Sequence, residues 1–346
     1  MNNKIVLAGL LSEELAEVFN KYPLFRCRQL YHWMLSGAKT FDDMTDLPAP
    51  MRKELEEKYR LFPGNTILEK KDTDGTLKMV SSLEDGAVIE GVVLSDAENR
   101  KTACLSTQAG CPMGCVFCKT GMMGYRRNLT AAEITGQFLQ LLHREPGISN
   151  IVIMGMGEPL LNLDALRKAI EFFMHPSGLN ISKRRITIST CGIEKGILEL
   201  ADKGPDVRLA FSLTTARQEL REQLMPVSRD HPLALVKEAL LHFQKKRDQR
   251  ITLEMVLLSG INTSPVEAGA VSEFARGLNV VINLIPWNHV EGLNLNGKIL
   301  KTPSSVEISA FAASLKHRGL KATQRYERGH GISAACGQLG SVVCST

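Results

Sequence analysis

Three cysteines that lie close together constrain this chain more than any other feature. Cys111, Cys115 and Cys118 follow a C-x3-C-x2-C spacing. Thiolates bind iron well, and this spacing lets a single loop wrap one cubane cluster. Three ligands leave the fourth iron open, which a closed cluster or a structural zinc site does not. Zinc remains the alternative, but it needs a fourth ligand nearby, and the next histidine, His143, is predicted to lie within a helix.

Composition narrows the class of protein. The chain has 346 residues and is 44% hydrophobic, which is enough for one large domain with or without a small appendage. No run of eighteen apolar residues predicts a transmembrane helix, and the start of the chain lacks a signal-peptide pattern. We therefore expect a cytoplasmic protein, in which eight cysteines indicate metal binding or catalysis rather than disulfides. A net charge of +5 permits a nucleic-acid partner without requiring one.

The first hundred residues show two sequence patterns, one helical and one β-rich. Helical periodicity at residues 25–34 and 51–59 predicts short amphipathic helices. Three β-rich runs follow, separated by Asp-Gly turn signals, at residues 66–69, 77–81 and 88–94. We therefore predict a small helical N-terminal domain at residues 1–62 and a β-rich connecting segment at residues 63–98.

From about residue 99 to residue 346, strands and helices alternate. Helical stripes occur at residues 163–174 and 233–246, and Thr130 with Glu133 forms a capping box that opens another helix. The predicted strands are residues 102–107, 150–156, 185–190, 207–213, 251–258 and 280–287. Repeated strand–helix units indicate parallel strands with right-handed crossovers. The fold class is therefore α/β, a partial (β/α) barrel with its site at the carboxyl ends of the strands.

Several ligand-binding candidates follow predicted strands. Gly157 and Glu158 end the second strand, where glycine allows a close backbone approach and the carboxylate can accept from an ammonium group. Ser189, Ser212 and Asn288 end the third, fourth and sixth strands. Each alone fits a solvated loop residue, but their shared position at strand ends favours a binding site.

Two further cysteines stand apart from the triplet. Cys104 lies in an apolar strand, where a buried cysteine commonly acts as a small hydrophobic residue. Cys336 follows Gly329, Gly331 and two alanines, which predicts a flexible tail able to carry its thiol into the barrel mouth. We interpret the remaining cysteines as structural or incidental: Cys27, Cys191 and Cys344.

Together these motifs resemble the radical S-adenosylmethionine (SAM) RNA adenine methyltransferases of the RlmN/Cfr family. The resemblance extends over nearly the whole chain, through residues 26–33, 41–48, Cys104 with the triplet, 155–160, 283–288 and 334–339. Cys104 combined with the segment around Cys336 is highly specific, since other radical-SAM enzymes lack that pair. The resemblance implies an RNA-binding helical domain ahead of a radical-SAM barrel.

The resemblance also implies a mechanism. C2 and C8 of adenine are poor nucleophiles, so a covalent route divides the transfer into easier steps. The triplet would hold one [4Fe-4S] cluster, on which SAM is cleaved to a 5′-deoxyadenosyl radical, and a second SAM would methylate Cys336. The radical formed from that methyl group would add to adenine and link protein to RNA. Cys104 would resolve this adduct and leave a disulfide for external reduction.

The remaining site residues are also placed by the resemblance. Glu90 falls where the family has its proton-accepting carboxylate, and an outward-facing strand residue is the equal alternative. The SAM-binding positions correspond to Gly157, Glu158, Ser189, Ser212, Thr214 and Asn288. Two departures are Thr214, where the family commonly has histidine, and Cys191, where it commonly has serine. The first puts any side-chain contact at 214 in doubt, and the second adds a thiol near the cofactor.

The resemblance implies 23S rRNA as the partner, with C2 of an adenosine as the favoured target. It leaves open the tRNA adenosine 3′ of the anticodon as a second substrate, C8 methylation of the antibiotic-resistance type, and an electron donor such as flavodoxin. A non-catalytic, metal-dependent RNA-binding module is the alternative of another class. Basic residues supply the expected RNA footprint, in three groups: Lys119 with Arg126 and Arg127, residues 183–185, and residues 245–250. Any one group alone is more often a solvated helix face, and Arg126 and Arg127 beside the site are the best candidates for phosphate contacts.

Overall fold

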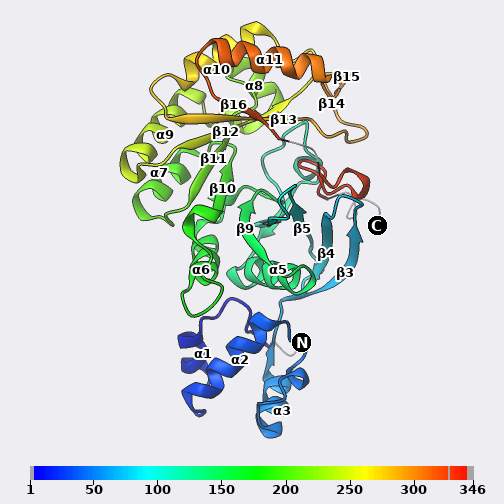
Figure 1. Ribbon diagram of the computed structural model, residues 1–346, viewed down its shortest axis with the longest axis vertical. Helices are drawn as coiled ribbons and strands as arrows, with labels where there is room; N and C mark the ends of the chain where they lie inside the picture. The colour runs from blue at the N-terminus through cyan, green and yellow to red at the C-terminus, as the bar shows by residue number, and fades with distance from the viewer. Residues whose placement is uncertain (1–3, 326–327, 341–346) are drawn as a thin grey trace.

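A mixed sheet runs through the computed structural model, which describes residues 4–325 and 328–340 (Figure 1). Its strand order is β16-β13-β12-β11-β10-β9-β6-β5-β4-β3. The strands from β6 to β16 are parallel: β6 (Lys101–Cys104), β9 (Ile148–Ile153), β10 (Ile186–Thr190), β11 (Arg208–Ser212), β12 (Ile251–Leu257), β13 (Val280–Pro286) and β16 (Ala322–Gln324). Because β16 and β3 are the two ends of this order, the sheet is the predicted partial barrel.

The predicted strands of the barrel are confirmed, with three differences. The strand predicted at residues 150–156 is β9, which begins at Ile148 and ends already at Ile153. The strand predicted at residues 102–107 ends at Cys104, because the chain then leaves the sheet and forms β7 (Gln108–Gly110). β7 pairs in antiparallel fashion with β8 (Tyr125–Asn128), and the cysteine triplet lies between them. The seventh parallel strand, β16, was not predicted because three residues are too short to show a period.

The β-rich segment continues the same sheet. β3 (Gly64–Lys71), β4 (Leu77–Leu83) and β5 (Val88–Ser95) pair in antiparallel fashion, and β5 pairs with β6. Gly75 and Gly86 have φ values of +84° and +74°, as the predicted Asp-Gly turns require. This extension brings β4 and β5 alongside the strand that carries Cys104.

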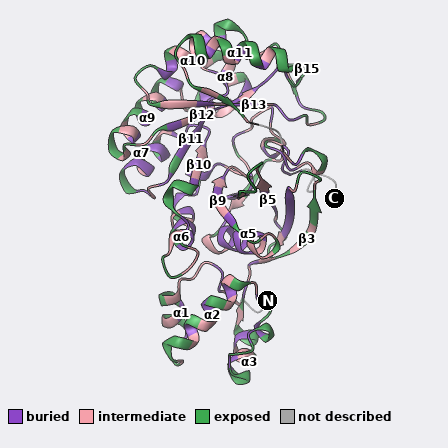
Figure 2. Cartoon of the chain, viewed as in Figure 1, coloured by how far each residue is buried: buried purple, intermediate pink, exposed green. Residues whose placement is uncertain are grey.

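Helices cover the outer side of the parallel strands (Figure 1). They are α5 (Ala131–Arg144), α6 (Leu163–Met174), α7 (Glu194–Lys203), α8 (Gln218–Leu224), α9 (Leu233–Arg247), α10 (Pro265–Ala275) and α11 (Ser305–His317). The predicted capping box is present, with the Glu133 amide donating to Thr130 Oγ1 at 3.2 Å. Buried residues concentrate between these helices and the sheet (Figure 2). The core therefore fixes the strands and leaves their carboxyl ends free to build a site.

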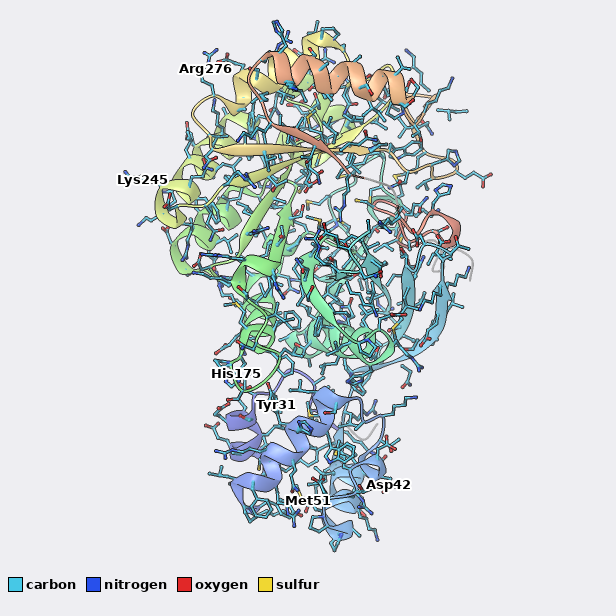
Figure 3. All side chains as sticks on the ribbon, viewed as in Figure 1. Tyr31, Asp42, Met51, His175, Lys245 and Arg276 are labelled. Carbon is cyan, nitrogen blue, oxygen red and sulfur yellow. The ribbon has the colours of Figure 1, made fainter. Side chains whose placement is uncertain are left out.

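The N-terminal helices form a small unit below the barrel (Figure 1). They are α1 (Ser12–Val18), α2 (Leu24–Ser36) and α3 (Ala49–Lys58), and the short strands β1 (Ile5–Val6) and β2 (Tyr59–Arg60) pair beside them. The Tyr31 ring meets Phe172 of α6 edge to face at 5.9 Å. Figure 3 shows Tyr31 and His175 at this junction, with Asp42 and Met51 farther from the barrel. The division at residues 62 and 98 stays a prediction.

The remaining elements are short. α4 (Lys119–Met122) follows the triplet, and β14 (Asn294–Leu295) pairs with β15 (Lys298–Ile299) in a hairpin after β13. Within residues 4–325 and 328–340, no helix combines the length and apolar character that crossing a bilayer demands.

Candidate active site and cluster-binding loop

A cavity of about 620 Å³ opens at the carboxyl ends of the parallel strands, where barrel sites are expected. Six cysteines line it: Cys104, Cys111, Cys115, Cys118, Cys191 and Cys336. They come from the end of β6, from the loop between β7 and β8, from the position just after β10, and from the tail after β16. The structure thus brings the two outlying cysteines of the sequence to the triplet.

The triplet loop is rigidly built. Gly110 has φ +80°, and a Cβ there would lie 2.0 Å from the Gly124 carbonyl oxygen, so only glycine fits. The Cys111 amide donates to that same oxygen at 2.8 Å. The Val116 amide donates to the Leu224 carbonyl at the end of α8, at 3.0 Å. The loop therefore holds its shape through backbone contacts on two sides.

The triplet thiols are shaped for a ligand larger than one ion. Burial raises the pKa of Cys111 to about 12 and raises the pKa values of Cys115 and Cys118. Among the residues that the structure describes, no three His, Cys, Asp or Glu side chains converge on a single-ion site. Zinc draws its sulfur ligands to about 2.3 Å, whereas a cubane spreads its ligands over separate irons. The triplet therefore fits an iron–sulfur cluster better than a single zinc ion.

Glu158 is held by the backbone around it. Its carboxylate accepts from the Cys191 amide at 2.8 Å and from the Leu160 amide at 3.1 Å. Burial raises its pKa, while these hydrogen bonds oppose the rise. Gly157 has φ +104°, and a Cβ there would lie 2.5 Å from Gln108 Cβ. The glycine is thus required for packing against β7, in addition to lining the cavity as the sequence predicted.

Three hydroxyl side chains line the opposite part of the cavity. Ser189 Oγ and Ser212 Oγ, at the ends of β10 and β11, lie 3.3 Å apart. Thr214 is fully buried at φ +56°, and its Oγ1 has no hydrogen-bond partner within the described residues. A buried hydroxyl without a partner is costly, so Thr214 is ready to bond to a polar ligand in the cavity.

The tail that carries Cys336 is docked, and the prediction of a flexible tail is wrong. The Asn288 side-chain amide donates to the Cys336 carbonyl at 2.8 Å. The Lys119 amide donates to the Gly337 carbonyl at 2.8 Å, and Thr120 Oγ1 donates to the Leu339 carbonyl at 2.7 Å. Asn288 lines the cavity, where it was predicted to contact the cofactor, and it also fixes the tail, which rests on the cluster loop.

Both outlying thiols have raised pKa values. Burial raises the pKa of Cys104 to about 12 and that of Cys336 to about 11. The positive charge of Arg325 opposes both rises, and each thiol is affected by other cavity groups, including Cys336 in the case of Cys104. These interactions show that the two thiols share one environment. The Cys336 side chain is nevertheless open to solvent, whereas that of Cys104 is half-buried.

Glu90 is fully buried, so the alternative of an outward-facing residue is wrong, but Glu90 is not among the residues that line the cavity. Its carboxylate pairs with the ammonium of Lys78 at 2.8 Å, and Lys78 is 1% exposed. Lys78 Nζ also donates to the Ser333 carbonyl on the Cys336 tail, at 3.0 Å. Glu90 lies on the same face of β5 as Val92, whose register partner is Cys104. The carboxylate is therefore tied to the tail through one lysine.

Sequence analysis missed three residues of the site. Lys78 was noted only as part of the β-rich run at residues 77–81, and Arg221 was not singled out, yet both are buried. Cys191 was interpreted as incidental, but it lines the cavity and donates its amide to Glu158. Only the departure of Cys191 from the family pattern gave a signal. Cys344 lies outside the described residues.

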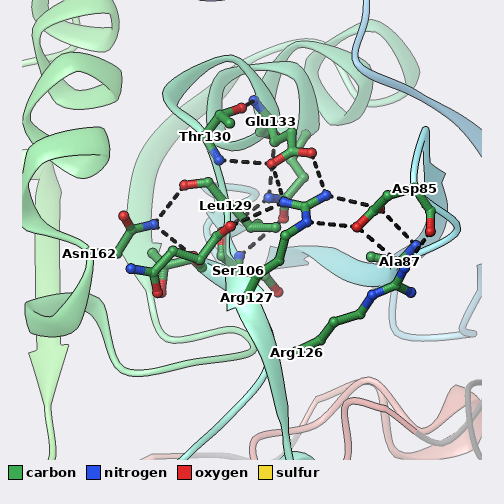
Figure 4. Close-up of polar contacts among 12 residues, drawn as sticks. Asp85, Ala87, Ser106, Arg126, Arg127, Leu129, Thr130, Glu133 and Asn162 are labelled. Carbon is green, nitrogen blue, oxygen red and sulfur yellow. Dashed lines mark hydrogen bonds and ion pairs between the residues drawn. The ribbon is translucent and has the colours of Figure 1, made fainter. Parts of the chain in front are cut away.

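Arg127 does not serve as the predicted phosphate contact. Its guanidinium donates to Asp85 at 2.8 and 3.0 Å, to Glu133 at 2.8 and 2.9 Å, and to the Asn128 carbonyl at 3.1 Å (Figure 4). These five hydrogen bonds use all five N–H donors of the Arg127 guanidinium. Arg126 lies 3.4 Å from the Asp85 carboxylate, and its side chain is 51% exposed. Of the two, only Arg126 is available to RNA.

The other basic groups lie away from the cavity or in ion pairs. Figure 3 shows Lys245 at the outer edge of the molecule, on the last turn of α9. Lys246 lies 3.7 Å from Asp202, and Lys183 pairs with Asp206. This agrees with the interpretation of these groups as solvated faces.

Comparison with known proteins decides the family. The family model for the radical SAM superfamily matches residues 105–268. A probable dual-specificity RNA methyltransferase RlmN from Treponema denticola is 51% identical over 98% of this chain and 96% of its own length. The protein of the same name from Treponema pallidum is 46% identical over 96% and 97% of the two chains. This chain belongs to the RlmN family of radical-SAM RNA methyltransferases.

A solved structure supports the same family. The crystal structure of a radical SAM methyltransferase from Sphaerobacter thermophilus matches with a TM-score of 0.92 and 37% identity, covering 97% of this chain and 99% of that one. The chain is therefore an enzyme, a SAM-dependent RNA methyltransferase. Membership implies a [4Fe-4S] cluster and SAM, and the triplet loop and the lined cavity fit both groups.

Proposed function

We propose that this enzyme methylates C2 of an adenosine in 23S rRNA through a methylated Cys336 and a covalent protein–RNA adduct. The observation that carries the proposal is the meeting of Cys104 and Cys336 with the cluster triplet around one cavity. A methyltransferase that used only polar transfer from SAM would need neither thiol. Two separate cysteines at one site are what formation and resolution of an adduct require.

The cysteines have distinct roles in this proposal. Cys336 takes a methyl group from one SAM: the S–C bond to Cys336 forms as its thiol proton leaves, the sulfonium–methyl bond breaks, and S-adenosylhomocysteine is released. When bound, the cluster supplies the electron that cleaves a second SAM, so two SAM molecules are used per turnover. After the adduct forms, Cys104 loses its proton and its sulfur attacks Cys336 Sγ; an S–S bond forms, the bond from Cys336 Sγ to the transferred carbon breaks, and that carbon keeps the electron pair and takes up a proton to become the methyl group. Two electrons from a donor of the flavodoxin class restore both thiols.

Glu90 and the cavity hydroxyls complete the set. We assign Glu90, buried beside the tail, as acceptor of the proton lost from the adenine ring. Gly157, Glu158, Ser189, Ser212 and Thr214 line the part of the cavity proposed for SAM. Asn288 orients Cys336 through its carbonyl instead of contacting the reacting atoms directly.

The RNA substrate is proposed from the family. Relatives are described as dual-specificity enzymes, which favours a second RNA class, tRNA, beside 23S rRNA. Proteins read RNA at unstacked bases, and a base must leave its stack to enter such a cavity. We propose residues 1–62 as the RNA-binding unit, residues 63–98 as a connecting segment and residues 99–346 as the catalytic unit, acting in the cytoplasm, where thiols stay reduced.

The position of the methyl group is tested by mass spectrometry of nucleosides from treated rRNA and tRNA. The proposal expects 2-methyladenosine. Mainly 8-methyladenosine would overturn the choice of C2 and support the antibiotic-resistance type. RNA binding without SAM cleavage or methylation, in a protein reconstituted with iron and sulfide, would support the non-catalytic module.

The cysteine roles are tested separately. Cys104→Ala is expected to accumulate the protein–RNA adduct, and Cys336→Ala to cleave SAM while transferring no methyl group. Cys27→Ala is the matched control, because Cys27 is buried in α2 and lies outside the cavity. Normal turnover by Cys104→Ala, with no adduct on denaturing gels, would remove Cys104 from the mechanism.

A further inference from the structure

Arg221 on α8 is the largest side chain that is fully buried in the described chain. Its guanidinium donates to the Ser212 carbonyl at 2.9 Å and to the Cys191 carbonyl at 2.6 Å, and also to the Leu213 carbonyl. It lies over the Phe211 ring, 5.0 Å from the centroid. Ser212 is the last residue of β11, and Cys191 and Leu213 come directly after β10 and β11. The charge of Arg221 therefore lies at the carboxyl ends of these strands.

Within the described residues, no carboxylate forms an ion pair with this guanidinium; the buried carboxylate of Glu158 lies nearby, bound to the amide of the same Cys191 whose carbonyl accepts from Arg221. Burial lowers the pKa of Arg221 to about 10, and the groups that oppose this are the thiols of Cys191 and Cys115. Its Nε has no hydrogen-bond partner among the described residues. Burying an ion costs several kcal/mol unless an opposite charge lies close by. Carbonyl dipoles offset part of this cost, but they supply no net negative charge.

The buried charge lies directly behind the cluster loop. The last residue of α8, Leu224, accepts from the amide of Val116, which follows Cys115 in the chain. Cys191 and Ser212, whose carbonyls bind Arg221, line the cavity, as does Met225 just after α8. Arg221 therefore lies just behind the cavity wall that the cysteine triplet helps to form.

We propose that Arg221 is a positioning residue whose buried charge acts on the iron–sulfur cluster and raises its reduction potential. A cubane with a 2+ core and three thiolates carries about one negative charge, and one-electron reduction makes it more negative. A fixed cation nearby stabilises the reduced form, in which an electron has passed from a flavodoxin-class donor to the cluster. The inference rests on the proposed function only through the cluster and is independent of the methylated position.

If Arg221 had only a structural role, substitutions that remove its charge would have different effects from those expected here. Arg221 also ties the segments after β10 and β11 together, and that role depends on hydrogen bonds rather than on charge. Arg221→Gln keeps an N–H donor for the carbonyls and loses the charge. Arg221→Lys keeps the charge and loses the planar fork. The two variants therefore separate charge from shape.

Arg167 supplies a matched control. It lies on α6, pairs with Glu199 at 2.8 Å and donates to the Gly204 carbonyl at 3.0 Å. Gly204 comes shortly before β11 begins, at the edge of the sheet opposite the cavity. Arg167→Gln removes an arginine from the same barrel, but far from the triplet loop.

The test is a redox titration of the anaerobically reconstituted protein, without SAM or RNA, with the reduced cluster followed by electron paramagnetic resonance. Iron and sulfide are measured first, so that each variant is compared at equal cluster content. We expect Arg221→Gln to shift the midpoint to more negative potential, Arg221→Lys to stay near wild type, and Arg167→Gln to leave it unchanged. An unchanged midpoint in Arg221→Gln, or equal shifts in the Gln and Lys variants, would overturn the proposal.

Cluster assembly provides a second readout. If Arg221→Gln takes up no cluster while Arg221→Lys does, the charge is needed to hold the anionic group, which supports the proposal. Failure of both variants would show that shape matters and would overturn it. A wild-type protein that assembles no cluster would remove the proposed function itself, an outcome distinct from an unshifted midpoint in a loaded variant.

Discussion

Replacing Lys78 with methionine removes one partner of a fully buried ion pair. Lys78 and Glu90 are 1% and 0% exposed, and their charged atoms lie 2.8 Å apart. Breaking such a pair from one side costs about 3–5 kcal/mol, because the remaining charge stays buried. The lost hydrogen bond to the Ser333 carbonyl, 3.0 Å long, adds about 1 kcal/mol. Methionine has a similar length, so no large cavity forms.

The expected total, about 4–6 kcal/mol, is a large share of a typical folding free energy of about 5–15 kcal/mol. Urea unfolding of the cluster-free protein measures it as a lower midpoint. The double variant Lys78→Met/Glu90→Leu provides the control, since replacing a whole buried pair with apolar residues is often neutral or stabilising. We expect the double variant to recover most of the loss.

Two results would refute this reasoning. A loss below about 1 kcal/mol in Lys78→Met would mean that the pair is accessible to water and behaves like a surface ion pair. Additive losses in the double variant would mean that the two side chains do not interact. The proposed methylation of Cys336 gives an independent check, because Lys78→Met also loses the anchor at Ser333 and is expected to lower the extent of that methylation.

Three other predictions follow from the site. Arg126→Met is expected to weaken RNA binding and to lower the slope of log affinity against log salt by about 1, measured by filter binding; an unchanged slope would exclude a phosphate contact. Arg127→Met is expected instead to cost about 1–2 kcal/mol of stability in urea. Arg127 holds the pKa of Asp85 below its usual range, so this cost is present above about pH 4 and shrinks as pH falls further; a cost independent of pH would contradict it. With its pKa raised to about 11, Cys336 is expected to react with iodoacetamide about tenfold faster per pH unit from pH 7 to 10, followed by peptide mass spectrometry; a plateau below pH 9 would contradict it.

Periodicity and turn residues carried most of the fold prediction. The stripe predicted a helix at residues 163–174, and α6 spans Leu163–Met174, with Leu166, Ile170 and Phe173 buried on one face. The Asp-Gly turns placed the hairpins of β3, β4 and β5. The ends of the strands were harder to predict, because the chain after Cys104 stays buried although it has left the sheet. Local sequence does not show that β7 pairs with β8 instead.

Rare residue types carried the site prediction, and common charged residues did not. Cysteines at unusual spacing indicated the cavity because few other roles explain them in a reduced protein. Arg127 looked like an RNA contact because its partner Asp85 lies 42 residues earlier in the chain. Nothing in the sequence singles out Lys78 or Arg221 as buried, since lysine and arginine are almost never fully buried without a partner. Whether a charged side chain is buried, paired or free to bind RNA depends on tertiary contacts, which a single sequence does not show.

The β3–β5 extension, predicted as a connecting segment, also holds the tail that carries Cys336. At the turn between β3 and β4, Asp74 accepts from the Gly329 amide at 2.8 Å and Asp72 accepts from the Gly331 amide at 3.0 Å. Two residues after this turn, Lys78 binds Ser333. These contacts hold the start of the tail at successive points before Cys336, and the Asn288 amide and the cluster loop hold it from the other side. The antiparallel strands are therefore the platform that presents the Cys336 thiol to the cavity, so changes in this hairpin should alter methyl transfer while leaving the triplet loop intact.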